Sequence, residues 1–313
     1  MDMIVNGRPI LANPPKSTLI VPYNTSSTTY RGFMNFTRDY AAELELHVSE
    51  KVATKRLLNL RALYLAGNIT KTSYEETLTS LIESRPHPRI IVIGDVHGCV
   101  SELRSLLRRC DYHPGDLLLF LGDLVSKGPS SKSVIKLART LKSLSVRGNH
   151  DFEVVRWSQA IKNNAEPPLY QTEHYTIART LSEADIKYMS SLPWYITCPG
   201  LNSLFVHAGF VSGVKLKKQN PRLMMNMRSI LPDGTVTSKF FENWPWARLW
   251  DGTETVYFGH DADRGLQSYD NAVGLDTGAV YGGRLTACVL PERRMVSVSA
   301  RKAYFMYRRK RYT

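Results

Sequence analysis

Three short segments rich in glycine, aspartate and histidine, each at the end of a predicted strand, constrain the fold more than any other feature of this chain. Apolar runs cover residues 90–93 and 117–121, and a third, short strand is predicted over 144–147. Runs of this kind predict strands buried on both faces. Helices are predicted over 100–109 and 131–144, with a third starting at Asp151. This alternation predicts an α/β fold with a mostly parallel sheet, whose carboxyl edge gathers the three polar segments.

The polar segments carry side chains that suit metal ions. They read Gly94-Asp95-Val96-His97-Gly98, Gly122-Asp123-Leu124-Val125-Ser126-Lys127-Gly128-Pro129 and Arg147-Gly148-Asn149-His150-Asp151. Asp95 and His97, one residue apart, can chelate one ion. The Asp123 carboxylate can bridge two ions about 3.5–4 Å apart, and Asn149 offers a carbonyl oxygen to the second.

Two further histidines follow later strands. His207 comes after a predicted strand over 204–206 and His260 after one over 256–258. A lone Gly-Asp pair is ordinarily a turn, and a lone histidine at a strand end is ordinarily a core residue. The ordered set of six oxygen and nitrogen donors instead predicts a metal site for Mn²⁺, Fe²⁺ or Zn²⁺.

The later strands also predict a second sheet. The segments 204–206, 256–258, 285–290 and 295–298 are strand-like, and no regular helix separates them. We therefore expect them to form a mixed or antiparallel sheet of their own.

Outside this region the chain divides into smaller parts. Residues 1–36 contain Pro9, Pro14, Pro15 and Pro22, which predicts an extended or disordered arm. Residues 37–86 have helical periodicity and predict a hairpin, which either packs on the next domain or serves oligomerisation or tethering. The catalytic domain is predicted over 87–300 and a basic, aromatic tail over 301–313.

Composition and charge limit the classes of protein. The chain has 313 residues, 43% of them hydrophobic, which excludes a wholly disordered or fibrous protein. Its apolar runs are far shorter than the roughly 18 residues of a membrane span. We expect no membrane span and no signal peptide, and take the cytosol as the default compartment, with the nucleus and the mitochondrion as alternatives. Cys99, Cys110, Cys198 and Cys288 form no close pair, which fits free thiols in a reducing compartment.

The net charge of +13 suggests a polyanionic partner. Eight of the cations lie in the last 21 residues, which contain no acidic residue. This segment can hold a phosphate backbone and stack bases, although a solvated last strand or a nuclear localisation signal explains it equally well. The candidate RNA-contacting residues are Arg301, Lys302, Arg308, Arg309, Lys310 and Arg311.

Taken together, the motifs resemble those of the calcineurin-like metallophosphoesterases, in the phosphoprotein phosphatase branch. The 122–129 segment, with residues 259–267 and 274–283, is similar to the ApaH-like phosphatases, which are relatives of bacterial symmetrical diadenosine tetraphosphatase. The resemblance covers roughly residues 88–300. It implies a two-sheet α-β-β-α sandwich and two divalent metal ions, with Mn²⁺ as the leading candidate and Fe²⁺, Zn²⁺, Co²⁺ or Mg²⁺ as alternatives.

The resemblance also implies roles around the metal ligands. His150 would protonate the departing oxygen, while Arg147 and Lys127 would bind phosphate oxygens. Arg248 is a weaker third candidate for phosphate, with a surface role equally plausible. Asp151 would either hydrogen-bond near His150 or cap its helix.

One departure bears on the substrate. Protein phosphatases of this branch usually have Asp-Arg where this chain has Ser126-Lys127. The serine offers no carboxylate to orient His150, and the lysine offers a point charge in place of a bidentate fork. We therefore expect hydrolysis of a phosphoanhydride at a nucleotide 5′ end, in a dinucleoside polyphosphate or capped RNA. The alternatives are an inorganic polyphosphatase, a Ser/Thr protein phosphatase and a catalytically silent RNA-binding subunit on the same fold.

Overall fold

The computed structural model describes residues 89–306 except 114–115, 165, 167, 169 and 171. It also describes residues 4–5, 8–9, 19–20, 70 and 72–73. The predicted arm and hairpin therefore lie almost entirely outside the described residues, as do residues 307–313 of the tail. These predictions, and the domain boundaries at 87 and 300, stay predictions.

The first sheet has five strands in the order β15-β14-β4-β5-β6. Strands β4 (Ile90–Ile93), β5 (Leu117–Phe120) and β6 (Leu144–Ser145) are parallel neighbours, as the apolar runs predict. Strand β14 (Arg284–Leu290) pairs antiparallel with β4 and with β15 (Arg294–Ser299). The expectation that the last two strands join the second sheet is wrong. Strand β14 is mostly buried and pairs with the edge of β4 that β5 leaves open. The local sequence does not reveal this pairing.

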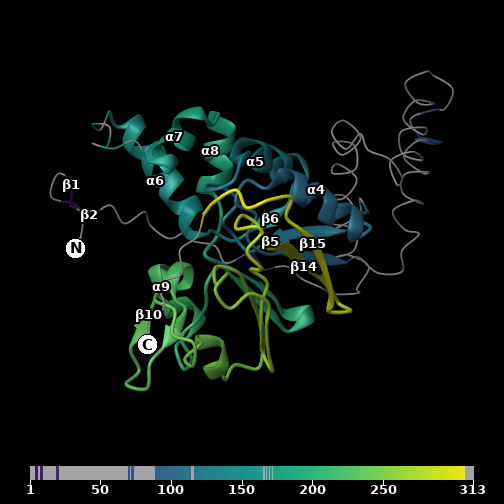
Figure 1. Ribbon diagram of the computed structural model, residues 1–313, viewed down its shortest axis with the longest axis vertical. Coiled ribbons are helices and arrows are strands. Elements are labelled where there is room, and N and C mark those ends of the chain that lie inside the picture. Colours follow the sequence, from purple (N-terminus) through teal and green to yellow (C-terminus); the bar gives the residue numbers. More distant parts are fainter. Residues whose placement is uncertain are drawn as a thin grey trace.

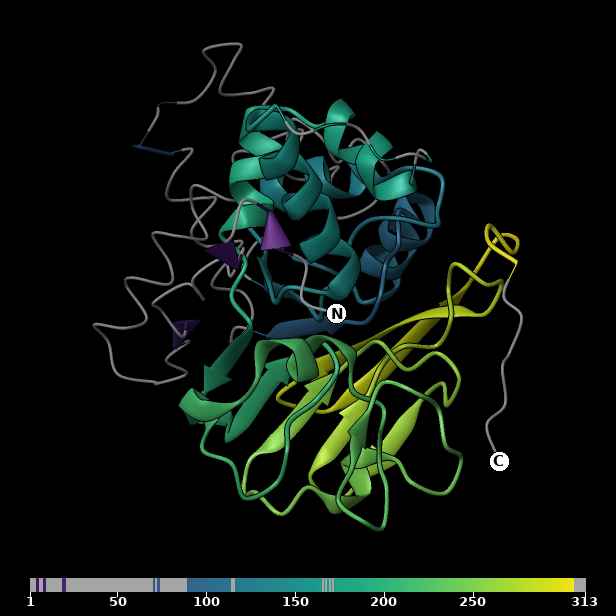
Figure 2. The ribbon, with the colours of Figure 1, turned by 90° about the vertical axis from the view of Figure 1, so that its left-hand side faces the viewer.

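Helices cover one face of this sheet, as Figures 1 and 2 show. They are α4 (Val100–Arg109), α5 (Ser131–Thr140), α6 (Asn149–Lys162), α7 (Glu173–Thr180) and α8 (Glu183–Ser190). Helix α6 begins two residues before the predicted start. Asn149, His150 and Asp151 therefore all lie in its first turn.

The second sheet has six strands in the order β12-β13-β11-β8-β7-β3. In that order they are β12 (Gln267–Tyr269), β13 (Ala272–Gly274), β11 (Thr255–Phe258), β8 (Ser203–Val206), β7 (Tyr195–Cys198) and β3 (Leu19–Ile20). Strand β11 is parallel to both β13 and β8. Strand β7 runs antiparallel to β8 and parallel to β3, and β12 runs antiparallel to β13. The predicted mixed sheet is thus present, with different outer strands.

Short elements complete the described part of the fold. They are α9 (Pro221–Asn226), β9 (Ser229–Ile230), β10 (Val236–Thr237), the 3₁₀ turns Pro199–Leu201, Leu216–Lys218 and Trp246–Leu249, and the separate pair β1 (Ile4–Val5) and β2 (Arg8–Pro9). Strands β9 and β10 pair with each other as a small antiparallel ribbon.

The core forms three layers because successive side chains of a strand face opposite sides. Ile91 and Ile93 of β4 pack with the helices, whereas Ile90 and Val92 pack against the second sheet. A third cluster, which includes Trp246, covers the outer face of the second sheet. Figure 2 shows the helices on one side, the green strands of the second sheet on the other, and the yellow strands β14 and β15 between them. The predicted α/β architecture with two main sheets is confirmed.

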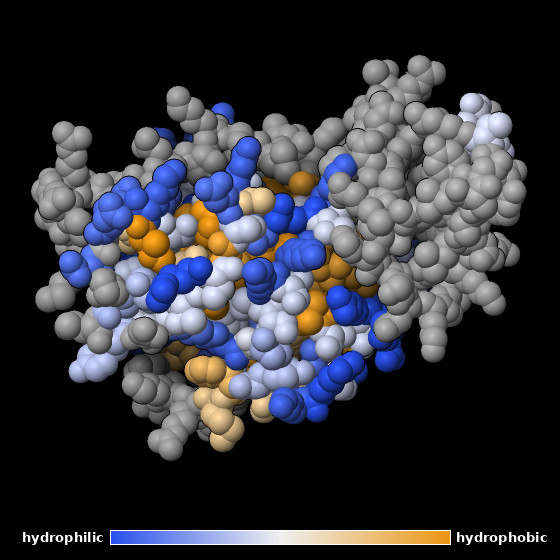
Figure 3. All heavy atoms as spheres, turned by 90° about the horizontal axis from the view of Figure 1, so that it is seen from above, coloured by the Kyte–Doolittle hydropathy of each residue, from blue (hydrophilic) through white to orange (hydrophobic). Residues whose placement is uncertain are grey.

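The surface over α5 to α8 is mainly hydrophilic, with small hydrophobic areas interrupted by charged side chains (Figure 3). Among the residues that the structure describes, no helix is long and apolar enough to cross a membrane. All four cysteines are free and buried, in agreement with the expectation of unpaired thiols.

Candidate active site

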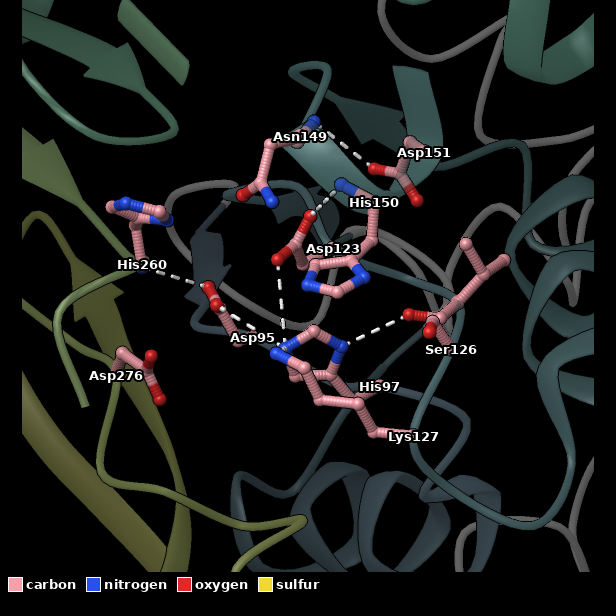
Figure 4. Close-up of polar contacts among 12 residues, drawn as sticks. Asp95, His97, Asp123, Ser126, Lys127, Asn149, His150, Asp151, His260 and Asp276 are labelled. Carbon is pink, nitrogen blue, oxygen red and sulfur yellow. Dashed lines mark hydrogen bonds and ion pairs between the residues drawn. The ribbon is translucent and has the colours of Figure 1, made fainter. Parts of the chain in front are cut away.

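Both sheets deliver the predicted ligands from the carboxyl ends of parallel strands. Asp95 and His97 follow β4, and Asp123 follows β5, its neighbour. His207 follows β8 and His260 follows β11, which are also neighbours. Figure 4 shows Asp95, His97, Asp123 and His260 converging where the two sheets and the first turn of α6 meet.

The Asp123 carboxylate lies at the centre of the cluster. Its Oδ2 is 3.5 Å from the Nε2 atoms of both His97 and His207. Ligand atoms of His97, Asp123 and His150 lie within 4.8 Å of one another, and so do those of Asp123, His207 and His260. Asp123 belongs to both groups, as a carboxylate that bridges two cations would.

The remaining predicted ligands border the same centre. Asp95 Oδ2 is 3.8 Å from His97 Nε2, and Asp95 Oδ1 is 4.0 Å from His207 Nδ1. The Asn149 side-chain oxygen lies 3.0 Å from His207 Nε2. The structure therefore brings all six predicted ligands together.

Backbone carbonyl groups orient two of the imidazoles. His97 Nδ1 lies 2.9 Å from the Val125 carbonyl, and His207 Nδ1 lies 2.7 Å from the Leu121 carbonyl. A carbonyl oxygen can only accept, so each Nδ1 carries the proton in these bonds. The Nε2 lone pairs consequently face the centre, which is the usual outer-shell arrangement of histidine metal ligands.

Burial sets the charge state of these groups. Burial, followed by the charge of Lys127, holds the pKa of His97 well below its ordinary value, and burial does the same for His260. His97 and His260 are therefore neutral, which is the form that binds metal. Burial opposes ionisation of Asp123, but the surrounding imidazoles, led by His207, lower its pKa below the ordinary value. Burial and neighbouring carboxylates raise the pKa of Asp95.

A further buried carboxylate, Asp276, was missed from the sequence. It follows β13, its side chain hydrogen-bonds to that of Asp95, and it accepts a 3.0 Å bond from the Gly278 N–H. Burial raises its pKa. The available signal was its position two residues beyond a strand end, the spacing that Asp95 also has.

His150 contacts a residue that the sequence analysis did not single out. Its Nδ1 lies 2.8 Å from Nε2 of His174, in α7, and the two rings stack with centroids 5.0 Å apart. The Asp151 carboxylate instead accepts 3.0 Å bonds from the backbone N–H groups of Gly148 and Leu124. Of the two roles expected for Asp151, its contacts match the capping role.

The segment with Ser126 and Lys127 is held by α7 as well. Ser126 Oγ donates to Glu173 Oε2 at 2.8 Å, and the Lys127 backbone N–H donates to Glu173 Oε1 at 2.7 Å. The Lys127 ammonium lies 3.0 Å from His97 Nε2 and 5.4 Å from the centroid of the Tyr281 ring. Lys127 thus places a positive charge beside the predicted ligands.

The two arginines predicted to bind phosphate differ in burial. Arg147 is buried, donates to the Ser190 carbonyl at 2.7 Å and stacks its guanidinium 4.6 Å from the Trp194 ring. Arg248 is exposed and donates to the Asn243 carbonyl at 3.3 Å. Arg228, which was not predicted, donates to the carbonyl of His260 at 3.0 Å. The phosphate-binding roles of Arg147 and Arg248 stay predictions, and Arg228 is a better-placed candidate.

The described start of the basic tail returns towards the site. The backbone N–H of Tyr304 donates to the Val280 carbonyl at 2.9 Å, and Ala303 pairs with Tyr281. Arg301 and Lys302, just before this pairing, have exposed side chains. Arg308, Arg309, Lys310 and Arg311 lie outside the described residues.

Comparison with known proteins agrees with this geometry. The family model for calcineurin-like phosphoesterases matches residues 88–276, more than half of the chain. The chain therefore belongs to the calcineurin-like phosphoesterase family, and the predicted resemblance is confirmed.

Three relatives and one crystal structure show which phosphoesterases this chain is similar to. The asymmetrical bis(5′-nucleosyl)-tetraphosphatase PrpE of Oceanobacillus iheyensis is 27% identical, over 69% of this chain and 94% of the relative. The symmetrical bis(5′-nucleosyl)-tetraphosphatase of Aromatoleum aromaticum is 26% identical, over 68% and 97%. Serine/threonine-protein phosphatase 1 of Salmonella typhimurium is 28% identical, over 67% and 96%. A crystal structure that carries the name of a diadenosine tetraphosphatase is 36% identical, with a TM-score of 0.62 over 68% of this chain and 94% of the other.

The donor set fits the divalent metal ions that the family implies. Buried carboxylates, neutral imidazoles and one amide oxygen are ligands for hard or borderline divalent cations. The shared Asp123 carboxylate fits a pair of ions better than a single ion. The chain is thus a phosphoesterase with a candidate metal centre built from both sheets.

Proposed function

We propose that this phosphoesterase hydrolyses phosphoanhydride bonds in nucleotide 5′ polyphosphates, using two divalent metal ions, with Mn²⁺ as the preferred ion. Its substrates would be dinucleoside polyphosphates and the triphosphate bridge of capped RNA. The observation that carries this proposal is the buried Asp123 carboxylate, which belongs to two groups of ligand atoms and lies beside His150.

The protein's own residues divide the work as follows. When bound, the metal ions supply Lewis-acid activation of the phosphate and of the attacking water. Asp95, His97, Asp123, Asn149, His207 and His260 would hold them. Lys127 and Arg228 would neutralise the charge that develops on the phosphate oxygens. His150 would give a proton to the departing oxygen.

Two observations support a nucleotide substrate. Bis(5′-nucleosyl)-tetraphosphatases of both the symmetrical and the asymmetrical kind are among the relatives. The basic C-terminal segment also starts beside Tyr281, whose ring lies next to Lys127. A chain of phosphates that leaves the metal centre past Lys127 would meet the exposed Arg301 and Lys302. These positive charges would suit a longer polyanionic substrate, such as the 5′ end of an RNA.

A Ser/Thr protein phosphatase is the second candidate because one relative carries that name. Ser126 and Lys127 argue against it, since Lys127 offers a single point charge to a phosphate in place of a bidentate fork. An inorganic polyphosphatase fits the positive charge equally well. A silent RNA-binding subunit fits less well because all six predicted ligands are present.

A hydrolysis panel with Mn²⁺ tests these alternatives directly. The substrates are diadenosine tetraphosphate, short capped RNA, long-chain polyphosphate and a phosphothreonine peptide, and Asp123→Asn is the control. We expect preferential, Asp123-dependent cleavage of the first two. Stronger turnover of the peptide or of polyphosphate would replace the proposal, and no turnover with metal bound would favour the RNA-binding subunit.

A further inference from the structure

The contact between His150 and His174 links two helices at the centre of the site. His150 lies in the first turn of α6, and His174 is the second residue of α7. Nδ1 of the first ring and Nε2 of the second are 2.8 Å apart, and the rings are inclined by 29°. Two imidazoles this close share one hydrogen bond, with one nitrogen donating and the other accepting.

His150 needs such a partner if it is to donate a proton in a fixed direction. Its ring turns about two side-chain torsions, and a general acid must point at the departing oxygen within hydrogen-bond reach. The neighbouring polar side chains have other partners, because Ser126 Oγ donates to Glu173 and the Asp151 carboxylate accepts from backbone N–H groups. Among the described residues, His174 provides the side-chain atom, Nε2, that lies within hydrogen-bond distance of a His150 ring nitrogen.

Packing and hydrogen bonds hold helix α7, and with it His174, in place. Tyr175, the next residue, packs edge-on against Trp157 of α6, with centroids 5.4 Å apart. On the other side of His174, Glu173 accepts bonds of 2.8 and 2.7 Å from Ser126 and Lys127. The His174 ring is therefore fixed relative to both the α6 turn and the segment that carries Lys127.

We infer that His174 is the positioning residue for His150. Its hydrogen bond to Nδ1 orients the other ring nitrogen of His150 towards the leaving group. This inference rests on the general-acid role of His150 in the proposed function. In the step, the N–H on Nε2 of His150 gives its proton to the departing oxygen, which keeps the electron pair of the broken P–O bond. Water supplies the oxygen of the new P–O bond and releases a proton to solvent. The hydrogen bond between His150 Nδ1 and His174 Nε2 stays in place throughout.

The inference is tested with three variants of the full, metal-loaded chain. His174→Ala removes the partner, and His174→Gln restores an amide at about the same reach. Thr176→Ala is the matched control, because Thr176 lies in the same helix with an exposed side chain. Two substrates with the same transferred group are compared, phenyl phosphate and p-nitrophenyl phosphate. Only the first has a leaving group that depends strongly on protonation.

We expect His174→Ala to lower kcat for phenyl phosphate by about 10- to 100-fold, and for p-nitrophenyl phosphate by less than about threefold. His174→Gln should recover most of the loss, and Thr176→Ala should match the wild type. An equal loss on both substrates, or no loss beyond that of Thr176→Ala, would overturn the inference. Failure of the wild type on diadenosine tetraphosphate alone, with aryl phosphates still cleaved, would overturn the proposed substrate and leave this inference standing.

A spectroscopic measurement tests the contact independently of turnover. In ¹⁵N-histidine-labelled protein loaded with diamagnetic Mg²⁺, the proton in the hydrogen bond between His150 Nδ1 and His174 Nε2 should give a slowly exchanging resonance, assigned by its loss in His150→Asn. The resonance should disappear in His174→Ala and remain in Thr176→Ala. Its persistence in His174→Ala would show that His174 does not hold the ring.

Discussion

Gly148 allows a close approach on which the metal centre depends, and replacing it with alanine isolates that effect. Its backbone has φ −85° and ψ 168°, which any residue adopts, so alanine carries no conformational penalty there. A Cβ at this position would, however, lie 2.1 Å from Asp123 Oδ1 and 2.3 Å from the Asp123 backbone nitrogen. Real Cβ contacts essentially never fall below 3.0 Å. The Asp123 carboxylate must therefore move by about 1 Å, which is the order of displacement that costs catalysis about 100-fold.

The same displacement has a cost in stability. Overpacking a filled interior destabilises by about 1–3 kcal/mol. Each kcal/mol lowers the Tm of a domain of this size by about 2–4 °C. The shift would also stretch the 2.9 Å bond between the His150 N–H and Asp123 Oδ1, which ties the first turn of α6 to the ligand. Gly148→Ala should thus weaken metal binding and turnover together.

The assay compares Mn²⁺ affinity by calorimetry, hydrolysis of diadenosine tetraphosphate, and Tm with and without Mn²⁺. Gly213→Ala is the control, because Gly213 has φ +75° and no atom within 4 Å of the Cβ position. It should lose about 1 kcal/mol through its backbone alone and keep normal metal affinity. A folded Gly148→Ala protein with wild-type affinity and turnover would refute the reasoning.

Three further predictions concern charge and burial. Asp276→Asn removes one of two adjoining buried carboxylates, so Tm should rise in EDTA and the increase of Tm with Mn²⁺ should shrink, both read by thermal unfolding. The native thiols should react with Ellman's reagent only after denaturation, because burial raises the pKa of Cys99 to about 12. Asp185→Asn should cost about 0.5–2 kcal/mol at pH 7, because Asp185 exchanges hydrogen bonds with the N-cap residue Ser182 of α8. Bonds to its carboxylate from the Ser182 hydroxyl, from Arg139 and from the Ser182 N–H lower the pKa of Asp185 against the opposing effect of burial. Its stabilisation is therefore present above the unfolded-state pKa and lost as pH falls through the folded value, so denaturation curves of the two proteins should converge in acid.

Four of the predicted metal ligands share one signal, a position within three residues of a strand end. Asp95 and Asp123 come two and three residues after apolar strands that are parallel neighbours, so local sequence and one rule of topology bring them together. His207 and His260 follow the same rule in the second sheet. Asp276 was equally accessible to this reasoning, since it lies two residues after β13.

Other features of the site and the fold depend on tertiary packing that no local sequence pattern indicates. His174 and Glu173 reach the site only because α7 packs beside α6, and nothing in their own sequence indicates the rings or backbone groups they contact. The position of β14 in the first sheet likewise follows from pairing between Ala287 and Ile93, nearly two hundred residues apart. Such long-range pairing is set by what completes the core, and apolar periodicity alone cannot distinguish between two sheets.

The ligand loops store backbone strain that their function requires. His97, Asp123 and His260 have φ values of 44°, 50° and 69°, in the left-handed region. This region costs a non-glycine residue about 1–2 kcal/mol. Glycine would relieve the strain but could not bind a metal ion.

The loops compensate by bonding to one another. The His97 N–H donates to the Asp123 carbonyl at 2.8 Å, and the His260 N–H donates to Asp95 Oδ1 at 3.1 Å. His97 and His260, two of the strained residues, are thus each held by another predicted ligand, and the bond from His260 to Asp95 joins the two sheets. Substitutions of Asp95 and Asp123 should be strongly non-additive, because the Asp95 carboxylate holds the His260 backbone and the Asp123 carboxylate holds the backbone of His150, next to Asn149. A double variant that weakens metal binding by the full sum of the single effects would contradict this interlocking.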